Sequence, residues 1–247
     1  KRTLLRNPNL TTPAAERNLN GGLFQGPLTT APKGAYTWVI EGDIRDCFGS
    51  IDHKVLLSIL RRTIRDRALL TVVRLMLKAG ALEDLRFYET ESGTPQGGIV
   101  SPLLANIYMH ELDQFISGQY EAVASRPQRA RLARRGVLIP CSIVRYADDF
   151  VVLVRGTEQQ AQTLKQAIAT FLREALHMDL SVEKTLVTHI TSGFDFLGYT
   201  IRAIRGKRDG RAKVIMRPSK RSVDRYRTNF RRICATLGQH SDLRSMF

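Results

Sequence analysis

Hydrophobic positions follow two different periods along this chain, and each period predicts a different kind of element. Runs rich in aromatic and β-branched residues predict strands at 36–44, 142–146, 150–154 and 194–201. Apolar residues at steps of three and four predict helices around 56–64, 69–77, 104–115, 164–176 and 223–237. Because helices and strands are mixed and some strands are joined by short turns, the predicted fold class is α+β. We expect an antiparallel sheet flanked by helices and followed by a helical segment.

Turn and breaker residues divide the chain into three parts. Residues 1–35 are rich in Asn, Thr, Pro and Gly and predict an irregular arm, residues 36–201 hold the predicted sheet, and residues 202–247 form a basic helical segment. Ser101 followed by Pro102 indicates a helix start, with Ser101 as the N-cap. Residues 126–135 carry five arginines and little apolar content, so we expect an exposed insertion there.

The composition indicates a polyanionic partner. The chain has 247 residues, of which 43% are hydrophobic, and a formal net charge of +15. Its length and hydrophobic content suffice for one or two domains with a core, and its charge favours nucleic acid or an acidic surface over a plainly solvated basic face. No apolar run reaches the roughly 18 residues that would cross a bilayer, and the first residues lack a signal-peptide core. We therefore expect a cytoplasmic protein without membrane contact.

Three carboxylates carry the candidate chemistry. Asp148 and Asp149 lie side by side between two predicted strands, so they would occupy the tip of a tight hairpin. Asp43 lies near the end of another predicted strand. If these strands are neighbours, the three carboxylates meet at one end of the sheet and offer the hard oxygen ligands that suit Mg²⁺. The alternative is a solvated turn, since the sequence alone does not establish that Asp43 meets the pair.

Five motifs, in order over roughly residues 38–201, resemble the reverse transcriptases of bacterial group II introns. Residues 144–150 (VRYADDF) are similar to the family's catalytic hairpin, and residues 42–53 (GDIRDCFGSIDH) to its first aspartate motif. Residues 92–108 (SGTPQGGIVSPLLANIY) resemble its template and nucleotide loop with the following helix. Residues 180–185 (LSVEKT) and 196–199 (FLGY) resemble the two later motifs.

The resemblance implies a right-hand polymerase palm over residues 36–201 and the start of a thumb, or maturase region, over 202–247. Two Mg²⁺ ions, which Mn²⁺ could replace, would be held by Asp43, Asp148, Asp149 and the Ile44 carbonyl. Lys184 would neutralise the departing pyrophosphate or donate a proton to it; the alternative is a surface lysine. Nucleotide contacts would come from Arg45, Asp46, Cys47, Phe48, Gln96 and Gly97. A primer grip would comprise Phe196, Leu197, Gly198 and Tyr199, and phosphate-backbone contacts would come from Arg217, Lys220, Arg221 and Arg225.

The Phe48 side chain is expected to act as a steric gate. A ring at this position would collide with a ribose 2′-hydroxyl, the group that distinguishes RNA precursors from DNA precursors. The alternative is an ordinary core aromatic. For Phe196–Tyr199 the alternative is sheet core, and for Gln96 and Gly97 it is a structural turn. Residues 1–35 show none of the family's fingers motifs.

Three functions remain open at this point. The first is an RNA-directed DNA polymerase that uses an RNA template, a DNA primer and dNTPs, and that also binds the intron RNA. The second is an RNA-binding splicing maturase that retains the palm as a scaffold with weak catalysis. The third is an RNA-dependent RNA polymerase, which Phe48 argues against.

Overall fold

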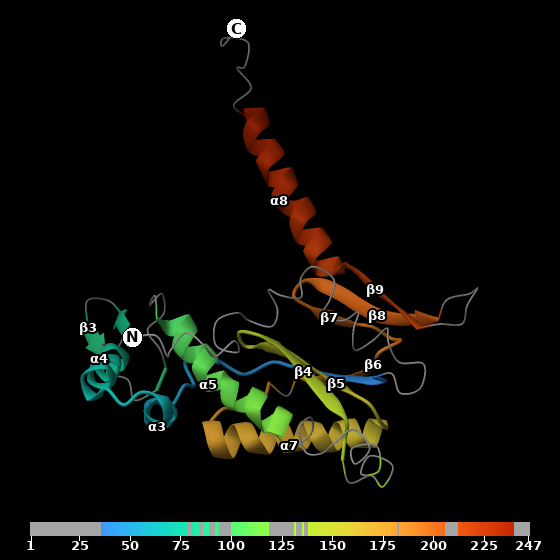
Figure 1. The fold of residues 1–247 in the computed structure, drawn as a ribbon. Helices are drawn as coiled ribbons and strands as arrows, with labels where there is room; N and C mark the ends of the chain where they lie inside the picture. Colours follow the sequence, from blue (N-terminus) through green and yellow to red (C-terminus); the bar gives the residue numbers. More distant parts are fainter. Residues whose placement is uncertain are drawn as a thin grey trace, which may run out of the picture.

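The computed structural model describes residues 36–78, 81–83, 86–88, 92–93, 100–118, 131, 135, 138–181, 183–205 and 212–239. The predicted arm at 1–35, the residues Gln96 and Gly97, and most of the arginine-rich segment 126–135 lie outside these ranges. Within them the α+β class is confirmed, with antiparallel sheets and flanking helices (Figure 1).

A four-stranded antiparallel sheet forms the centre of the molecule. Its strands are β1 (Trp38–Gly42), β4 (Cys141–Tyr146), β5 (Asp149–Val154) and β6 (Leu186–His189), in the order β4-β5-β1-β6. Strand β5 is apolar on both faces, because Phe150 and Val152 face one core while Val151 and Leu153 face another. Successive side chains alternate across a strand, so this continuous apolar run is what a central strand buried on both sides requires.

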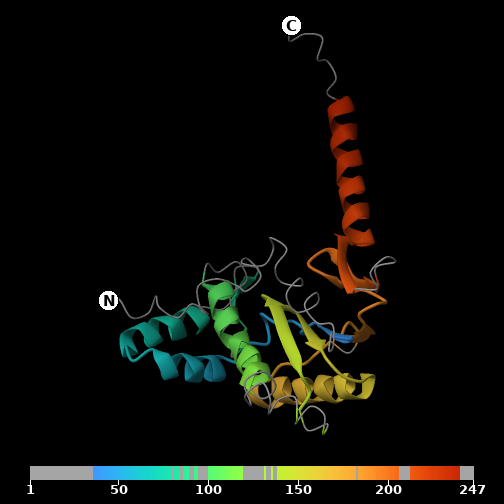
Figure 2. The ribbon, with the colours of Figure 1, turned by 45° about the vertical axis from the view of Figure 1, so that its right-hand side comes forward.

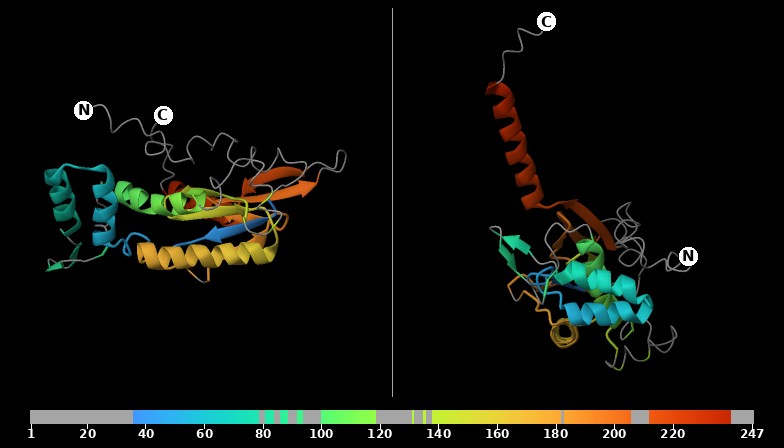
Figure 3. Two further views of the ribbon diagram at one scale, coloured as in Figure 1. Left: turned by 60° about the horizontal axis from the view of Figure 1, so that its bottom comes forward. Right: turned by 90° about the vertical axis from the view of Figure 1, so that its left-hand side faces the viewer.

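Helices cover one face of this sheet (Figures 1 and 3). Helix α5 (Ser101–Ile116) and helix α7 (Glu158–Leu176) lie along it, and α3 (His53–Thr63) and α4 (Arg67–Lys78) stand beside α5. Helix α7 begins with a capping box between Thr157 and Gln160. It buries residues spaced by three or four, namely Ala161, Leu164, Ile168, Leu172 and Leu176. A short hairpin joins β2 (Ala81–Glu83) to β3 (Arg86–Tyr88).

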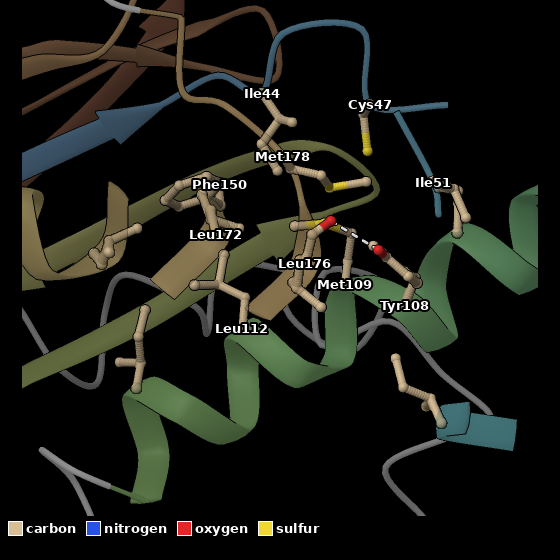
Figure 4. Packing of buried hydrophobic residues seen from close by; sticks show 14 of the residues in the cluster. Ile44, Cys47, Ile51, Tyr108, Met109, Leu112, Phe150, Leu172, Leu176 and Met178 are labelled. Carbon is tan, nitrogen blue, oxygen red and sulfur yellow. Dashed lines mark hydrogen bonds between the residues drawn. The ribbon is translucent and has the colours of Figure 1, made fainter. Parts of the chain in front are cut away.

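The helix-side core closes around Tyr108 on α5. Figure 4 shows its hydroxyl donating to the Leu176 carbonyl at the end of α7, at 2.7 Å. The same hydroxyl accepts from the Asp52 amide at 3.4 Å. Asp52 in turn caps α3, and its carboxylate lies 3.0 Å from the His177 ring at the C-terminal end of α7. One buried phenol therefore ties three helices together beneath the sheet.

A second sheet packs on the opposite face. It contains β7 (Phe194–Phe196), β8 (Tyr199–Arg205) and β9 (Ala212–Pro218), all antiparallel. Phe194, Phe196 and Ile201 bury against the far face of β1 and β5. Helix α8 (Lys220–Gln239) follows and projects away from the body of the molecule (Figure 2). No described helix is long and apolar enough to span a membrane.

Three details differ from the sequence predictions. Ser101 is the first residue of α5 rather than its N-cap, a position taken by Val100 without a side-chain hydrogen bond. The single strand predicted at 194–201 is a hairpin that turns at Leu197–Gly198. The segment from 202 is not wholly helical, because β8 continues to Arg205 and β9 pairs with it before α8 begins.

Candidate active site

The register of the central sheet brings Asp43 to Asp149. Strands β1 and β5 pair antiparallel, with Gly42 opposite Phe150, so the next step places Asp43 beside Asp149. Gly42 is needed at this point because a methyl group there would overlap the Phe150 ring. The two carboxylates come from residues 106 positions apart in sequence, and strand pairing alone makes them neighbours.

Asp148 lies in the two-residue turn between β4 and β5. Tyr146 pairs with Asp149, which leaves Ala147 and Asp148 as the turn. Ala147 has a positive φ of 55°, a conformation that is unfavourable for any residue with a side chain. The predicted hairpin is confirmed, with Asp149 already belonging to β5.

A cavity of about 180 Å³ opens beside these carboxylates. Asp43, Asp149 and Lys184 line it, together with the tip of the β7–β8 hairpin. The Lys184 Nζ atom lies 3.3 Å from Asp43 Oδ2. Because the lysine side chain is 71% exposed, this ion pair is weak and easily exchanged for another cation. The structure thus places the sequence-predicted lysine in direct contact with the first aspartate.

The local electrostatics favour a bound cation. The pKa of Asp149 is raised above its usual range, first because neighbouring atoms displace water from its carboxyl and then because Asp148 and Asp43 repel its charge. Lys184 opposes this rise. Because two neighbouring carboxylates disfavour the charged form of Asp149, a nearby positive charge would stabilise that form.

The carboxylates of Glu41 and Asp195 line the same cavity, and neither was singled out from the sequence. Glu41 accepts from the Thr188 hydroxyl at 2.8 Å and from the Asp195 amide at 3.3 Å. Burial raises the pKa of Glu41, and these two hydrogen bonds only partly offset it. The alternation of a strand could have identified Glu41, because it lies two residues before Asp43 and so faces the same side.

The residues after Asp43 form a tight turn. Ile44 bridges to Leu180, and the amide of Arg45 donates to the Asp179 carbonyl at 2.9 Å. Arg45 and Asp46 are exposed, whereas Cys47 is buried in the helix-side core. Burial raises the pKa of the Cys47 thiol to about 12, so this side chain stays neutral. The predicted nucleotide contact of Cys47 stays a prediction.

Phe48 is half-buried against the same core. The position fits a packed aromatic with one accessible edge, and its role as a steric gate stays a prediction. The neighbouring Gly93 amide donates to the Ile51 carbonyl at 2.8 Å, and His53 Nε2 lies 2.6 Å from the Gly93 carbonyl. The start of the predicted template loop is thus fixed beside this turn, while Gln96 and Gly97 lie outside the described residues.

The predicted primer grip is a hairpin at the mouth of the cavity. Phe196 is buried in the second core, Leu197 lines the cavity, and Tyr199 is 41% exposed. The Gly198 carbonyl accepts from the Ser219 amide at 2.8 Å and from the Ser222 hydroxyl at 2.9 Å. The hairpin tip is therefore fixed to the start of α8, where the predicted phosphate contacts Arg217, Lys220, Arg221 and Arg225 are all exposed.

The donor set fits a hard divalent cation in its chemistry. Asp43, Asp148 and Asp149 offer only carboxylate oxygens, which Mg²⁺ and Mn²⁺ prefer over sulfur and nitrogen. In the described part of the chain, however, no three His, Cys, Asp or Glu side chains gather closely enough to hold a metal ion. Strand pairing brings the three aspartates to the same end of the central sheet.

Comparisons with known proteins agree with this geometry. The family described as "Reverse transcriptase (RNA-dependent DNA polymerase)" matches residues 9–201, and the chain belongs to this family. The match begins at residue 9, within the segment where the sequence showed us no family motif.

Curated relatives confirm the resemblance to the group II intron type. The chain is 37% identical over 226 residues to group II intron-encoded protein LtrA of Lactococcus lactis subsp. cremoris, covering 73% of this chain and 38% of that protein. It is 34% identical over 192 residues to protein YkfC of Escherichia coli K12, covering 72% and 50%. The chain therefore spans half or less of the length of these relatives.

Solved structures share the fold at low identity. Apo telomerase from Candida tropicalis, truncated from its C-terminal domain, superposes with a TM-score of 0.55 at 13% identity, over 83% of this chain and 39% of that one. Telomerase from Candida albicans in complex with a fragment of telomeric RNA gives a TM-score of 0.50 at 14% identity, over 76% and 31%. These likenesses support the palm architecture.

Proposed function

We propose that this chain carries the polymerase centre of an RNA-directed DNA polymerase of the group II intron type. The observation that carries the proposal is the meeting of Asp43 and Asp149 on paired strands, at a cavity that Lys184 also enters. An RNA template, a DNA primer and dNTPs would be its substrates, and the intron RNA a further partner.

Each residue would have a separate role in nucleotidyl transfer. Two Mg²⁺ ions held by Asp43, Asp148 and Asp149, with the Ile44 carbonyl, would lower the cost of forming the attacking alkoxide and stabilise the leaving pyrophosphate. Lys184 is exposed and weakly paired with Asp43, so it would be free to offer its charge or proton to the pyrophosphate. The accessible edge of Phe48 would exclude a 2′-hydroxyl.

The exposed basic surface of β9 and α8 would hold the nucleic-acid backbone. Arg217, Lys220, Arg221 and Arg225 are solvent-exposed and lie on one continuous stretch of chain beyond the hairpin tip. Such a surface contacts phosphates without reading sequence, and its affinity falls steeply with salt.

Primer extension on an RNA template tests the proposal. Purified protein with Mg²⁺ should extend a DNA primer with dNTPs and discriminate against rNTPs, whereas Asp149→Asn should extend it on the order of 1,000-fold more slowly. Asp195→Asn is a matched control, because Asp195 lines the same cavity from the second sheet. Absence of extension by the unmodified chain, with RNA binding intact, would refute the polymerase proposal.

RNA binding without primer extension is the result expected of a maturase. The observation that favours this second function is the exposed basic surface of Arg217, Lys220, Arg221 and Arg225. One relative at 19% identity, from Arabidopsis thaliana, is named nuclear intron maturase 1. A maturase of this kind would bind its intron RNA through α8 and would not need Asp149.

A further inference from the structure

A single arginine connects the Asp148 turn to a helix on the covered face of the sheet. Arg145 is on β4, two residues before the turn, and its side chain is 11% exposed. Its Nη1 atom donates to the Ala147 carbonyl at 2.8 Å and to Asn106 Oδ1 at 3.0 Å. Its Nε and Nη2 atoms donate to the carboxylate of Asp113 at 3.0 and 2.7 Å.

All three nitrogen atoms of the Arg145 guanidinium, Nε, Nη1 and Nη2, donate hydrogen bonds. The Asp113 carboxylate receives the paired contacts of a fork, which an ammonium cannot make. Because Asp113 is only 25% exposed, the pair is poorly screened by water. Burial raises the pKa of Asp113, but hydrogen bonds from His110 and Arg145 bring it below its usual range, so the carboxylate stays charged.

The Nη1 atom also donates to the carbonyl of Ala147, the turn residue whose backbone conformation is unfavourable. Ala147 holds a φ of 55°, and such a conformation persists when the surroundings fix it. Fixing the Ala147 carbonyl fixes the peptide plane that leads into Asp148. Asn106 and Asp113 lie seven residues apart on α5, so both face the sheet from one side of that helix.

We propose that Arg145 is a positioning residue that clamps the Asp148 turn to α5 and thereby sets where the Asp148 carboxylate lies. The proposal rests on the proposed polymerase function for its catalytic consequence. Its structural consequence, a turn held rigid by α5, stands independently. A simple anchoring role would stabilise the contact between α5 and the sheet without affecting the turn.

Arg145→Lys separates these two roles. Lysine keeps a positive charge opposite Asp113, so that carboxylate is not left unpaired, but it cannot hold Asp113, Asn106 and the Ala147 carbonyl together. The matched control is Arg62→Lys, because Arg62 also pairs with a carboxylate on α5, Glu111 at 2.8 Å, but belongs to α3 rather than to β4. Hydrogen–deuterium exchange of residues 146–149 and primer-extension kinetics are measured for both variants.

The clamp predicts faster exchange at 146–149 in Arg145→Lys than in Arg62→Lys or the unmodified chain. It also predicts a fall in kcat on the order of 100-fold, with KM for dNTP and the melting temperature close to those of the control, because misplacing a catalytic group by about 1 Å has this effect. Unchanged exchange at the turn, or a kcat loss no larger than that of Arg62→Lys, overturns the proposal.

Two further arms keep the test decisive. If Arg145→Lys does not fold, Asn106→Ala removes one acceptor of Nη1 and leaves the Asp113 pair intact; it should raise exchange at the same four residues, and unchanged exchange there overturns the clamp. If the unmodified chain extends no primer, the polymerase proposal fails, and the exchange comparison alone still decides whether Arg145 holds the turn.

Discussion

Two hairpins meet at the candidate active site, and each is held in place by hydrogen bonds from a different part of the molecule. The β4–β5 hairpin turns at Ala147–Asp148 and is held by the Arg145 side chain, which reaches back to α5. The β7–β8 hairpin turns at Leu197–Gly198, where both φ angles are positive, as in a type I′ turn. Its Gly198 carbonyl is held by the backbone and side chains that begin α8.

The difference shows which parts would move together. The carboxylate-bearing turn is coupled to the helices beneath the central sheet, whereas the proposed primer grip is coupled to the projecting basic helix. A ligand that shifts α8 would therefore displace the Gly198 turn while leaving Asp148 in place. Four changes to the chain break or sharpen this contrast, in order of decreasing effect.

The largest effect is expected from Asp149→Asn in the first hairpin. Loss of one charged oxygen from the carboxylate group should lower the primer-extension rate on the order of 1,000-fold, as loss of preorganised charge stabilisation does in other active sites. Folding should be retained, because the substitution also removes repulsion by Asp148 and Asp43. Steady-state extension and circular dichroism measure the two. A rate close to that of the unmodified chain would mean that Asp149 is not in the catalytic centre.

Gly198→Ala should break the second hairpin. The new Cβ atom would lie 2.9 Å from the Ser222 hydroxyl oxygen, at a φ of +80° that alanine adopts only with strain. We expect a loss of about 1–3 kcal/mol in the free energy of unfolding, measured in urea. Gly118→Ala is the matched control, because nothing lies within 4 Å of its Cβ. Equal stability of the two variants would show that the α8 contact does not hold the turn.

Part of the pH dependence of stability should come from Asp52, the N-cap of α3. Burial raises the pKa of Asp52, but the amides of Val55 and Lys54 and the ring of His177 bring it below its usual range. A lowered folded-state pKa stabilises the protein above the unfolded pKa, about 3.8 here, and this contribution is lost as pH falls through the folded value.

Comparison with Asp52→Asn measures that contribution. Asparagine still caps a helix, so the variant should be less stable by about 1 kcal/mol at pH 7. The two proteins should become equally stable once pH falls below the folded-state pKa of Asp52. Urea unfolding at several pH values gives the difference. A gap that persists at low pH would assign the effect of Asp52 to capping geometry rather than charge.

Ala147→Gly should have the smallest effect. Glycine adopts a positive φ without strain but loses more conformational entropy on folding, and the two effects are each about 1 kcal/mol. The melting temperature should therefore change little, with exchange at 146–149 still slow because Arg145 holds the carbonyl. A rapid rise in exchange would mean that the alanine methyl group, and not the arginine, fixes the turn.

Short-range patterns in the sequence located the three carboxylates, but the pairing of β1 with β5 that brings Asp43 to Asp149 came only from the structure. Asp43 and Asp149 each lie at the end of an apolar strand, and the continuous apolar run of β5 indicates a central strand buried on both faces. Once the strands pair, their register places the two carboxylates side by side. The helices were predictable for the same reason, since their buried residues recur every three or four positions.

What the sequence did not reveal depends on contacts between distant residues. The strand at 212–218 was missed although Val214 and Ile215 follow the Asp209–Gly210 turn signal, because the basic residues around them obscured the pattern. Its pairing with β8 establishes it. The clamp of Arg145 requires Asn106 and Asp113 from a helix about 30 to 40 positions away. The burial of Cys47 likewise depends on how the turn after Asp43 packs on the core.

Crystals soaked in Mn²⁺ test the central claim most directly, because anomalous scattering locates the ion without any assay of activity. The account predicts Mn²⁺ bound between Asp43 and Asp149, with Lys184 displaced from Asp43. Density at Glu41 and Asp195 alone, or an intact Lys184–Asp43 pair at saturating Mn²⁺, would contradict it.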